Sequence, residues 1–251
     1  MEVFGSSGAR GIAGTELTPE FALKVAQAAG TVWEADRAAV ATDTRLTGGM
    51  FADATAAGLA GVGLAVDRLG VTPTPSIARY CEQQAIPGVM LTASHNPPEY
   101  NGIKLIGADG IELSIDRLER IEAHALGEEF DLVPWELVGE SREIDTANDS
   151  YLRSLIDAVD TDRIADGELT VALDTGHGAG GLVSPEFYRE LGCEVVTVTA
   201  QLDGPLPGRM PEPVLDNLDE LGRLVTAADA DVGIAHDGDA ARGRHTDDSA
   251  H

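Results

Sequence analysis

Short runs of β-branched and other apolar residues alternate along the chain with longer stretches whose apolar residues recur every three or four positions. The first pattern is typical of buried strands and the second of amphipathic helices. In the first half, strands are predicted near Val3-Phe4 and over residues 38–42, 89–91 and 103–106. Helices are predicted after Thr18-Pro19, over residues 50–60 and after Ser114. Thr18 and Ser114 suit the N-cap position of the helices that they precede.

The second half repeats the alternation more clearly. Strands are predicted over residues 169–173, 194–198 and 231–235, and helices over 184–191 and 215–228. Strands that alternate with helices form mainly parallel sheets. Residues 127–147, rich in Glu, Gly and Asp, are interpreted as the connection between two units. We therefore predict two mainly parallel-sheet α/β domains, over 1–140 and 141–242, followed by a polar, non-periodic tail over 243–251.

The charge of the chain excludes some classes of partner. Its 251 residues include 43 Asp or Glu and 17 Lys or Arg, for a formal net charge of −26. Binding to nucleic acid or to an anionic membrane surface needs clustered basic residues, so neither is an expected partner. The N-terminus has no basic start followed by an apolar stretch, which predicts a cytoplasmic protein without a signal peptide.

Lysine is scarce, since Lys24 and Lys104 are the only two in the chain. Together with the acid excess, this indicates adaptation to a cytoplasm rich in potassium salt. At molar salt a Debye length of roughly 3 Å screens surface carboxylates from one another. An acidic protein from an organism that lives at ordinary ionic strength is the alternative interpretation.

Ser94 directly follows a predicted strand, at the edge where open α/β sheets usually carry their reactive groups. Two prolines stiffen the loop, His95 and Asn96 carry donor groups, and Lys104 lies on the next strand. A serine held in this way can act as a nucleophile or as a phosphate carrier. An ordinary turn serine is the alternative.

Asp237 and Asp239 lie on one tight loop at the end of the last predicted strand, with Gly238 between them. Carboxylate oxygens in this arrangement suit Mg²⁺, and the glycine allows a close approach. The same pattern also occurs in plain turns, which is the alternative interpretation.

Residues 176–181 read GHGAGG and match the GxGxxG pattern of dinucleotide sites. A dinucleotide-binding oxidoreductase is therefore a competing hypothesis. Such a site needs an acidic residue at the end of the following strand, and neither Glu194 nor Asp203 is so placed. Asp174 would also put a negative charge beside the pyrophosphate. We interpret this glycine loop as structural or as part of a domain interface.

Three segments together resemble the α-D-phosphohexomutase family, the phosphoglucomutases and phosphomannomutases. Residues 4–11 (FGSSGARG) are similar to the family's opening FGTSGIRG, and residues 92–97 (TASHNP) reproduce its active-site loop. Residues 237–242 (DGDAAR) resemble its DGDxDR metal loop. The resemblance implies a phosphosugar mutase that transfers a phosphoryl group between the 1- and 6-positions of a hexose phosphate.

The resemblance also implies roles for individual residues. Ser94 would carry the phosphoryl group, and its phosphate would bind Mg²⁺ together with Asp237 and Asp239. A hexose 1,6-bisphosphate would be the activator and intermediate. Three further residues would serve catalysis by proton transfer and charge stabilisation: His95, Lys104 and Arg10. Three would bind phosphate or substrate: Arg242, Thr92 and Asn96.

Two departures from the family pattern change these expectations. Ala241 occupies the place of a third aspartate, so water would replace one Mg²⁺ ligand. The family's third and fourth domains have no match, and polar residues from 243 onward stand where the family has a hydrophobic strand. We therefore expect a haloarchaeal member of the family that is truncated after the metal loop. A non-catalytic fragment that retains Mg²⁺ or phosphosugar binding is the alternative.

Overall fold

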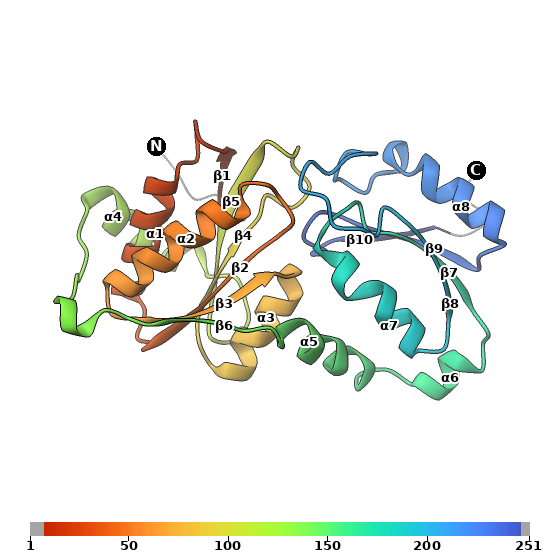
Figure 1. The fold of residues 1–251 in the computed structure, drawn as a ribbon, viewed down its shortest axis with the longest axis horizontal. Coiled ribbons are helices and arrows are strands. Elements are labelled where there is room, and N and C mark those ends of the chain that lie inside the picture. The colour runs from red at the N-terminus through yellow and green to blue at the C-terminus, as the bar shows by residue number, and fades with distance from the viewer. Residues whose placement is uncertain (1–7, 247–251) are drawn as a thin grey trace.

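The computed structural model describes residues 8–246, which form two α/β units side by side (Figure 1). The first unit is built on a six-stranded sheet of order β1-β5-β4-β2-β3-β6, and the second on a four-stranded sheet of order β10-β9-β7-β8. Within both sheets most strand pairs are parallel. The predicted fold class is therefore confirmed.

The first unit contains these elements in chain order: β1 (Ala9–Ile12), α1 (Pro19–Val32), β2 (Arg37–Thr42), α2 (Gly48–Gly61), β3 (Ala65–Val71), α3 (Thr74–Gln84), β4 (Gly88–Leu91), β5 (Tyr100–Ile106), α4 (Ile115–Gly127), the 3-10 turn η1 (Trp135–Leu137) and β6 (Ser141–Glu143). The second contains α5 (Ala147–Ile156), α6 (Thr161–Ala165), β7 (Thr170–Asp174), η2 (Ala179–Leu182), α7 (Ser184–Glu190), β8 (Glu194–Val198), η3 (Leu215–Asn217), α8 (Asp219–Ala228), β9 (Val232–His236) and β10 (Gly243–Thr246).

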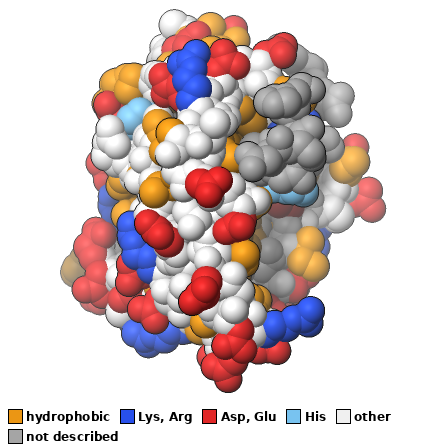
Figure 2. All heavy atoms as spheres, turned by 90° about the vertical axis from the view of Figure 1, so that its right-hand side faces the viewer, with side chains coloured by type: hydrophobic (Ala, Val, Ile, Leu, Met, Phe, Trp, Pro, Cys, Tyr) orange, Lys and Arg blue, Asp and Glu red, His pale blue; other side chains and the backbone are white. Residues whose placement is uncertain are grey.

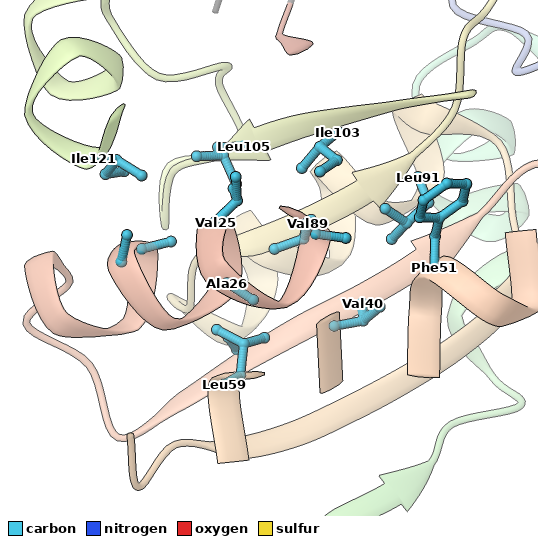
Figure 3. Close-up of a cluster of buried hydrophobic side chains, with 14 of the residues drawn as sticks. Val25, Ala26, Val40, Phe51, Leu59, Val89, Leu91, Ile103, Leu105 and Ile121 are labelled. Atoms are coloured by element: carbon cyan, nitrogen blue, oxygen red, sulfur yellow. The ribbon is translucent and has the colours of Figure 1, made fainter. Parts of the chain in front are cut away.

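Helices cover both faces of the first sheet, because its central strands are apolar on both sides. On β2, Val40 points toward α1, α2 and α4, whereas Ala39 and Ala41 point toward α3. Figure 3 shows the larger of the two clusters, in which Phe51 of α2 packs near Leu91 of β4. This packing holds the carboxyl ends of β2 and β4 in fixed positions.

Local signals explain where the first helix begins. The Thr18 hydroxyl accepts a hydrogen bond from Phe21 N at 3.2 Å, and Pro19 occupies the first turn, as predicted. Ser114 also occupies the N-cap position of α4, but its side chain makes no capping hydrogen bond. Among the helices of residues 8–246, none is both long and apolar enough to cross a membrane.

β4 runs antiparallel to β5, although it is parallel to its other neighbour, β2. Only residues 92–99 connect β4 to β5, and parallel strands need a crossover of a dozen or more residues. These residues, which we name the Ser94 loop, are therefore held at both ends by adjacent strands.

In the second unit, β7 lies between β8 and β9, with α8 and α7 packed against different clusters of its apolar residues. The tail was expected to lack a strand from residue 243 onward, and this expectation is wrong. Residues 243–246 form β10, antiparallel to β9. An edge strand needs only backbone hydrogen bonds on one side, and polar side chains are common there.

Several expected features differ from the structure or lie outside it. β3, α3 and β6 were not predicted, and β6 extends the first sheet to residue 143, beyond the expected boundary at 140. The expected strand near Val3-Phe4 and the first half of the segment at residues 4–11 lie outside the described residues, as do residues 247–251.

Candidate active site

Ser94 occupies a strained position at the start of the loop that follows β4. Its φ is +54°, in the left-handed region that L-residues rarely adopt, and the residue is only 2% exposed. Ser94 N donates to Thr92 Oγ1 at 2.9 Å, and the Thr92 hydroxyl donates to Asp43 at 2.7 Å. Thr92 is fully buried, so its hydroxyl supports the turn around Ser94. Such strain is characteristic of functional sites.

Residues 237–242, which we name the metal loop after the motif that they resemble, follow β9 and reach the Ser94 loop across the boundary between the two units. Ser94 Oγ donates to Asp237 Oδ2 at 2.6 Å, although the two residues are 143 positions apart. A Cβ atom on Gly238 would lie 2.9 Å from Ser94 O. Glycine at this position therefore lets the two loops lie in close contact.

Asp239, the second carboxylate of the metal loop, is held by groups of the first unit. Its Oδ2 accepts from Thr74 Oγ1 at 2.7 Å and from Lys104 Nζ at 3.3 Å. Its Oδ1 accepts from Ala241 N at 3.3 Å. Lys104 is itself 5% exposed, so this charge pair is almost removed from water.

The two carboxylates have different protonation behaviour. Burial, together with the charge of Asp239, raises the pKa of Asp237 to about 7. Burial also disfavours ionised Asp239, but the Lys104 ammonium and the hydrogen bond from Thr74 outweigh it and lower the pKa of Asp239. Two adjacent carboxylates with separated pKa values are typical of catalytic and metal-binding sites.

The side chains of His95 and Arg242 are in contact at a solvent-exposed position. Arg242 Nη1 donates to His95 Nδ1 at 2.6 Å. Burial lowers the pKa of His95, as do the nearby charges of Arg242 and Arg10, which favours the neutral ring. A ring that accepts at Nδ1 carries its proton at Nε2, so His95 presents a donor to a ligand.

Arg10 contacts Asn96 of the Ser94 loop. Arg10 Nη1 donates to Asn96 Oδ1 at 3.0 Å, and Arg10 Nε is buried without a partner. Burial lowers the pKa of Arg10. An unsatisfied guanidinium donor is costly inside a protein unless an anion completes it. The structure thus gathers the nine predicted site residues around one point, with Thr92 beneath the surface.

The oxygen atoms around Ser94 suit Mg²⁺. Asp237, Asp239 and Ser94 Oγ supply hard oxygen atoms from one small region, which is the chemistry that Mg²⁺ favours. Within residues 8–246, no three His, Cys, Asp or Glu side chains converge as a ready metal cluster. Mg²⁺ commonly keeps several waters, so two carboxylates and one further oxygen fit this ion.

The glycine loop, residues 176–181, supports the metal loop from behind. A Cβ atom on Gly178 would lie 2.5 Å from Gly238 O, and Ala179 N donates to the same oxygen at 2.9 Å. Position 178 therefore requires glycine, because a side chain there would collide with the backbone of Gly238. The arrangement agrees with the structural interpretation of this loop.

Sequence reasoning missed two residues that hold the site. Arg45 is buried beneath the Ser94 loop, and Thr74 lies at the start of α3 against Asp239. Arg45 follows the end of β2, a position that had been recognised as a strand end but given no role. Thr74 belongs to a helix that was not predicted, so no sequence signal identified it.

Comparison with known proteins agrees with this arrangement. Residues 1–131 match the family model of phosphoglucomutase/phosphomannomutase, alpha/beta/alpha domain I, and residues 149–247 match domain II of the same family. A "Probable phosphoglucosamine mutase" of Methanosarcina barkeri is 43% identical over 96% of this chain and 54% of its own length. A phosphoglucomutase/phosphomannomutase of Thermococcus kodakarensis is 41% identical over 99% of this chain and 56% of its own length.

A solved structure of similar fold is a phosphoglucomutase/phosphomannomutase family protein from Burkholderia thailandensis. It has a TM-score of 0.83 and 26% identity, and the match covers 98% of this chain and 54% of that one. This chain therefore spans about half the length of the curated relatives that it matches. From both domain matches and these relatives, the chain belongs to the phosphoglucomutase/phosphomannomutase family.

Proposed function

We propose that this chain supplies the phosphoryl-carrying half of a phosphosugar mutase, with Ser94 as the phosphoserine. The hydrogen bond of 2.6 Å between Ser94 Oγ and Asp237 Oδ2 is the observation that carries the proposal. It joins the nucleophile of one unit to an acidic loop of the other, in a cluster of buried charges. Phosphoryl transfer depends mainly on alignment and on neutralisation of oxygen charge, which such a cluster supplies.

The proposed reaction exchanges two phosphate esters. The P–O bond to Ser94 Oγ breaks as a P–O bond to a sugar hydroxyl forms, and the hydroxyl proton passes, with Lys104 as carrier, to Ser94 Oγ. In the second half-reaction, the other phosphoryl group of the hexose 1,6-bisphosphate passes to Ser94 Oγ: its P–O bond to the sugar breaks, and the proton of the serine hydroxyl passes to the sugar oxygen. A hexose 1-phosphate and a hexose 6-phosphate are thereby interconverted.

The remaining residues have proposed roles that follow from their positions. His95 donates through Nε2 to a phosphate oxygen, and Arg242 holds the ring in that orientation. The unpartnered Nε of Arg10 binds a phosphate or sugar oxygen, while Asn96 fixes the other end of its guanidinium. Positive groups aimed at the transferring oxygens stabilise the charge that develops there.

Asp237 and Asp239 are the proposed protein ligands of Mg²⁺, with the oxygen or phosphate of Ser94. When bound, Mg²⁺ neutralises phosphate oxygen charge and orients the transferring group. Thr74 and Lys104 hold Asp239 in place, and the backbone N–H of Arg242 holds Asp237 at 3.1 Å.

The sugar is proposed only as a class. Curated relatives include a phosphoglucosamine mutase, a phosphoglucomutase/phosphomannomutase and, at 37% identity, a phosphopentomutase from Thermococcus kodakarensis. A panel of glucose, mannose, glucosamine and pentose phosphates is therefore the appropriate substrate set.

Peptide mass spectrometry tests the proposal directly. Protein in molar KCl is incubated with Mg²⁺ and glucose 1,6-bisphosphate, beside the Ser94→Ala variant and a sample in EDTA. We expect one phosphoryl group on Ser94 of the wild type and none in either control. A folded wild-type protein that stays unmodified would contradict the proposal.

A second candidate function follows from Ala241, which replaces an acidic ligand with an apolar side chain. In this alternative the chain binds Mg²⁺ and phosphosugar weakly without transfer. Calorimetry that shows phosphosugar binding, together with an unmodified Ser94, would support this alternative over the mutase.

A further inference from the structure

The carboxylate of Asp43, directly after β2, anchors a buried arginine. Asp43 Oδ2 accepts from Arg45 Nε at 3.0 Å and from Thr92 Oγ1 at 2.7 Å. Asp43 Oδ1 accepts from Arg45 N, also at 3.0 Å. The Arg45 side chain is fully buried, so this ion pair is isolated from solvent.

Arg45 uses its four remaining N–H groups on carbonyls of the Ser94 loop and of Tyr100, the first residue of β5. Nη2 donates to Ser94 O at 3.0 Å and to Asn96 O at 2.8 Å. Nη1 donates to Pro97 O at 2.5 Å and to Tyr100 O at 3.0 Å. All five donors of the guanidinium are therefore satisfied, and four of them hold the backbone that carries the nucleophile.

The second unit contains the same arrangement around Asp174, the last residue of β7. Asp174 accepts from Gly176 N at 2.8 Å, from the Thr199 hydroxyl and from Arg209 Nε at 2.6 Å. Arg209 Nη2 donates to His236 O at 2.6 Å, and Nη1 donates to the carbonyls of Met210 and Pro211 at 3.1 and 3.2 Å.

The two arrangements occupy equivalent places in their sheets. β2 lies between β3 and β4, and the Ser94 loop follows β4; β7 lies between β8 and β9, and the metal loop follows β9. In each unit an aspartate at the end of the central strand binds an arginine, a threonine hydroxyl and a backbone N–H two residues ahead. In each, the arginine binds a carbonyl at or next to a reactive residue of the neighbouring loop.

We propose that Arg45 and Arg209 are positioning residues: Arg45 aims Ser94, and Arg209 aims the metal loop. This inference rests on the proposed function, because it concerns how the nucleophile and the metal ligands are brought together. A planar guanidinium can bind a carboxylate and several carbonyls at fixed angles. Lysine has three donors on a flexible stem, so it keeps the charge but loses the geometry.

The variants Arg45→Lys and Arg209→Lys separate the two roles. Ser94 phosphorylation by hexose 1,6-bisphosphate is followed over time at a series of Mg²⁺ concentrations. R45K is expected to lower the maximal rate at least about tenfold without changing the Mg²⁺ concentration at half-maximal rate. R209K is expected to raise that concentration about 10- to 100-fold, as for other residues that orient metal ligands.

Arg142→Lys is the matched control. Arg142 also binds a buried aspartate, Asp67, with Nε 2.6 Å from Oδ1, but at the edge strand β6. R142K is expected to leave both readouts unchanged. Folded R45K and R209K proteins that keep the wild-type maximal rate and the wild-type Mg²⁺ concentration at half-maximal rate would overturn the proposal. Equal changes of both quantities in both variants would also overturn it.

Hydrogen exchange of the wild-type protein tests whether Arg45 holds the Ser94 loop in place, even if a variant fails to fold. Amides of the Ser94 loop are expected to exchange nearly as slowly as those of β4. Exchange at the rate of an unconstrained loop would overturn the proposal. This measurement needs no phosphoryl transfer. A wild-type protein that is never phosphorylated would therefore contradict the proposed function, and the role of Arg45 in holding the Ser94 loop could still be tested.

Discussion

Thr74 and Asp239 are joined by two hydrogen bonds, although one belongs to the first unit and the other to the second. Thr74 N donates to Asp239 O at 2.9 Å, and Thr74 Oγ1 donates to Asp239 Oδ2 at 2.7 Å. The backbone and the carboxylate of one proposed metal ligand are thus both held by the start of α3. The geometry of the metal loop therefore depends on the docking of the two units.

Thr74→Val is expected to destabilise the protein by about 1–3 kcal/mol, because it removes the shortest of the three hydrogen bonds to the buried Asp239 carboxylate and leaves only those from Lys104 Nζ and Ala241 N. Urea unfolding followed by circular dichroism measures the change. Thr74→Ser retains the hydroxyl and serves as the control, with a loss of less than about 1 kcal/mol from the missing methyl group. Equal stabilities of T74V and T74S would show that the side-chain hydrogen bond contributes little.

Asp237→Asn is expected to stabilise the protein at pH 8 in EDTA. The pKa of Asp237 is about 7 in the folded protein against 3.8 without its surroundings, so the folded state binds the proton more tightly. The stabilisation that protonated Asp237 gives the folded state is fully present below about pH 4. It is lost as the pH rises to 7, which lowers the free energy of unfolding by up to about 4 kcal/mol. An amide is neutral throughout this range.

Urea unfolding of D237N and wild type at pH 5 and pH 8 tests the direction of this pH dependence. The stability difference in favour of D237N is expected to grow between the two pH values. A difference that is constant with pH would mean that the carboxyl titrates alike in the folded and unfolded protein. The same variant is expected to lose Mg²⁺-dependent phosphorylation of Ser94.

Gly178→Ala is expected to displace the metal loop, because the added Cβ would lie 2.5 Å from Gly238 O. Overpacking of this kind costs about 1–3 kcal/mol. Gly222→Ala, in the exposed part of α8 with no atom within 4 Å of its Cβ, is the matched control and is expected to stabilise by about 0.5–1 kcal/mol. Thermal unfolding distinguishes the two, and a G178A protein as stable as G222A would contradict the contact.

Potassium chloride is expected to raise the melting temperature. The chain carries a net charge of −26, and Figure 2 shows Asp and Glu side chains spread over the end of the molecule formed by the second unit. Raising the salt from 0.1 M to 1 M shortens the Debye length from about 10 Å to about 3 Å and screens this repulsion. Sucrose at equal osmolality controls for solvent exclusion, and an equal effect of both would contradict a charge mechanism.

The sequence by itself determined the elements whose signals are local. The Thr18-Pro19 pair begins α1, and the apolar runs at residues 38–42 and 89–91 become β2 and β4. Ser94 and Asp237 were both predicted at strand ends, because a strand followed by Pro- or Gly-containing segments is readable without knowledge of the fold. β10 was missed because its strand character comes from pairing with β9 and not from its own polar residues.

Only the tertiary structure decided which of these strand ends meet. The 2.6 Å contact between Ser94 and Asp237 spans 143 positions and depends on the docking of two units that contain different sheets. Arg45 and Thr74 carry no sequence signal for their roles, since each acts through carbonyls or a carboxylate supplied by distant segments. Hydrophobic periodicity is a property of neighbouring residues, whereas an active site is assembled from long-range contacts that only packing brings together.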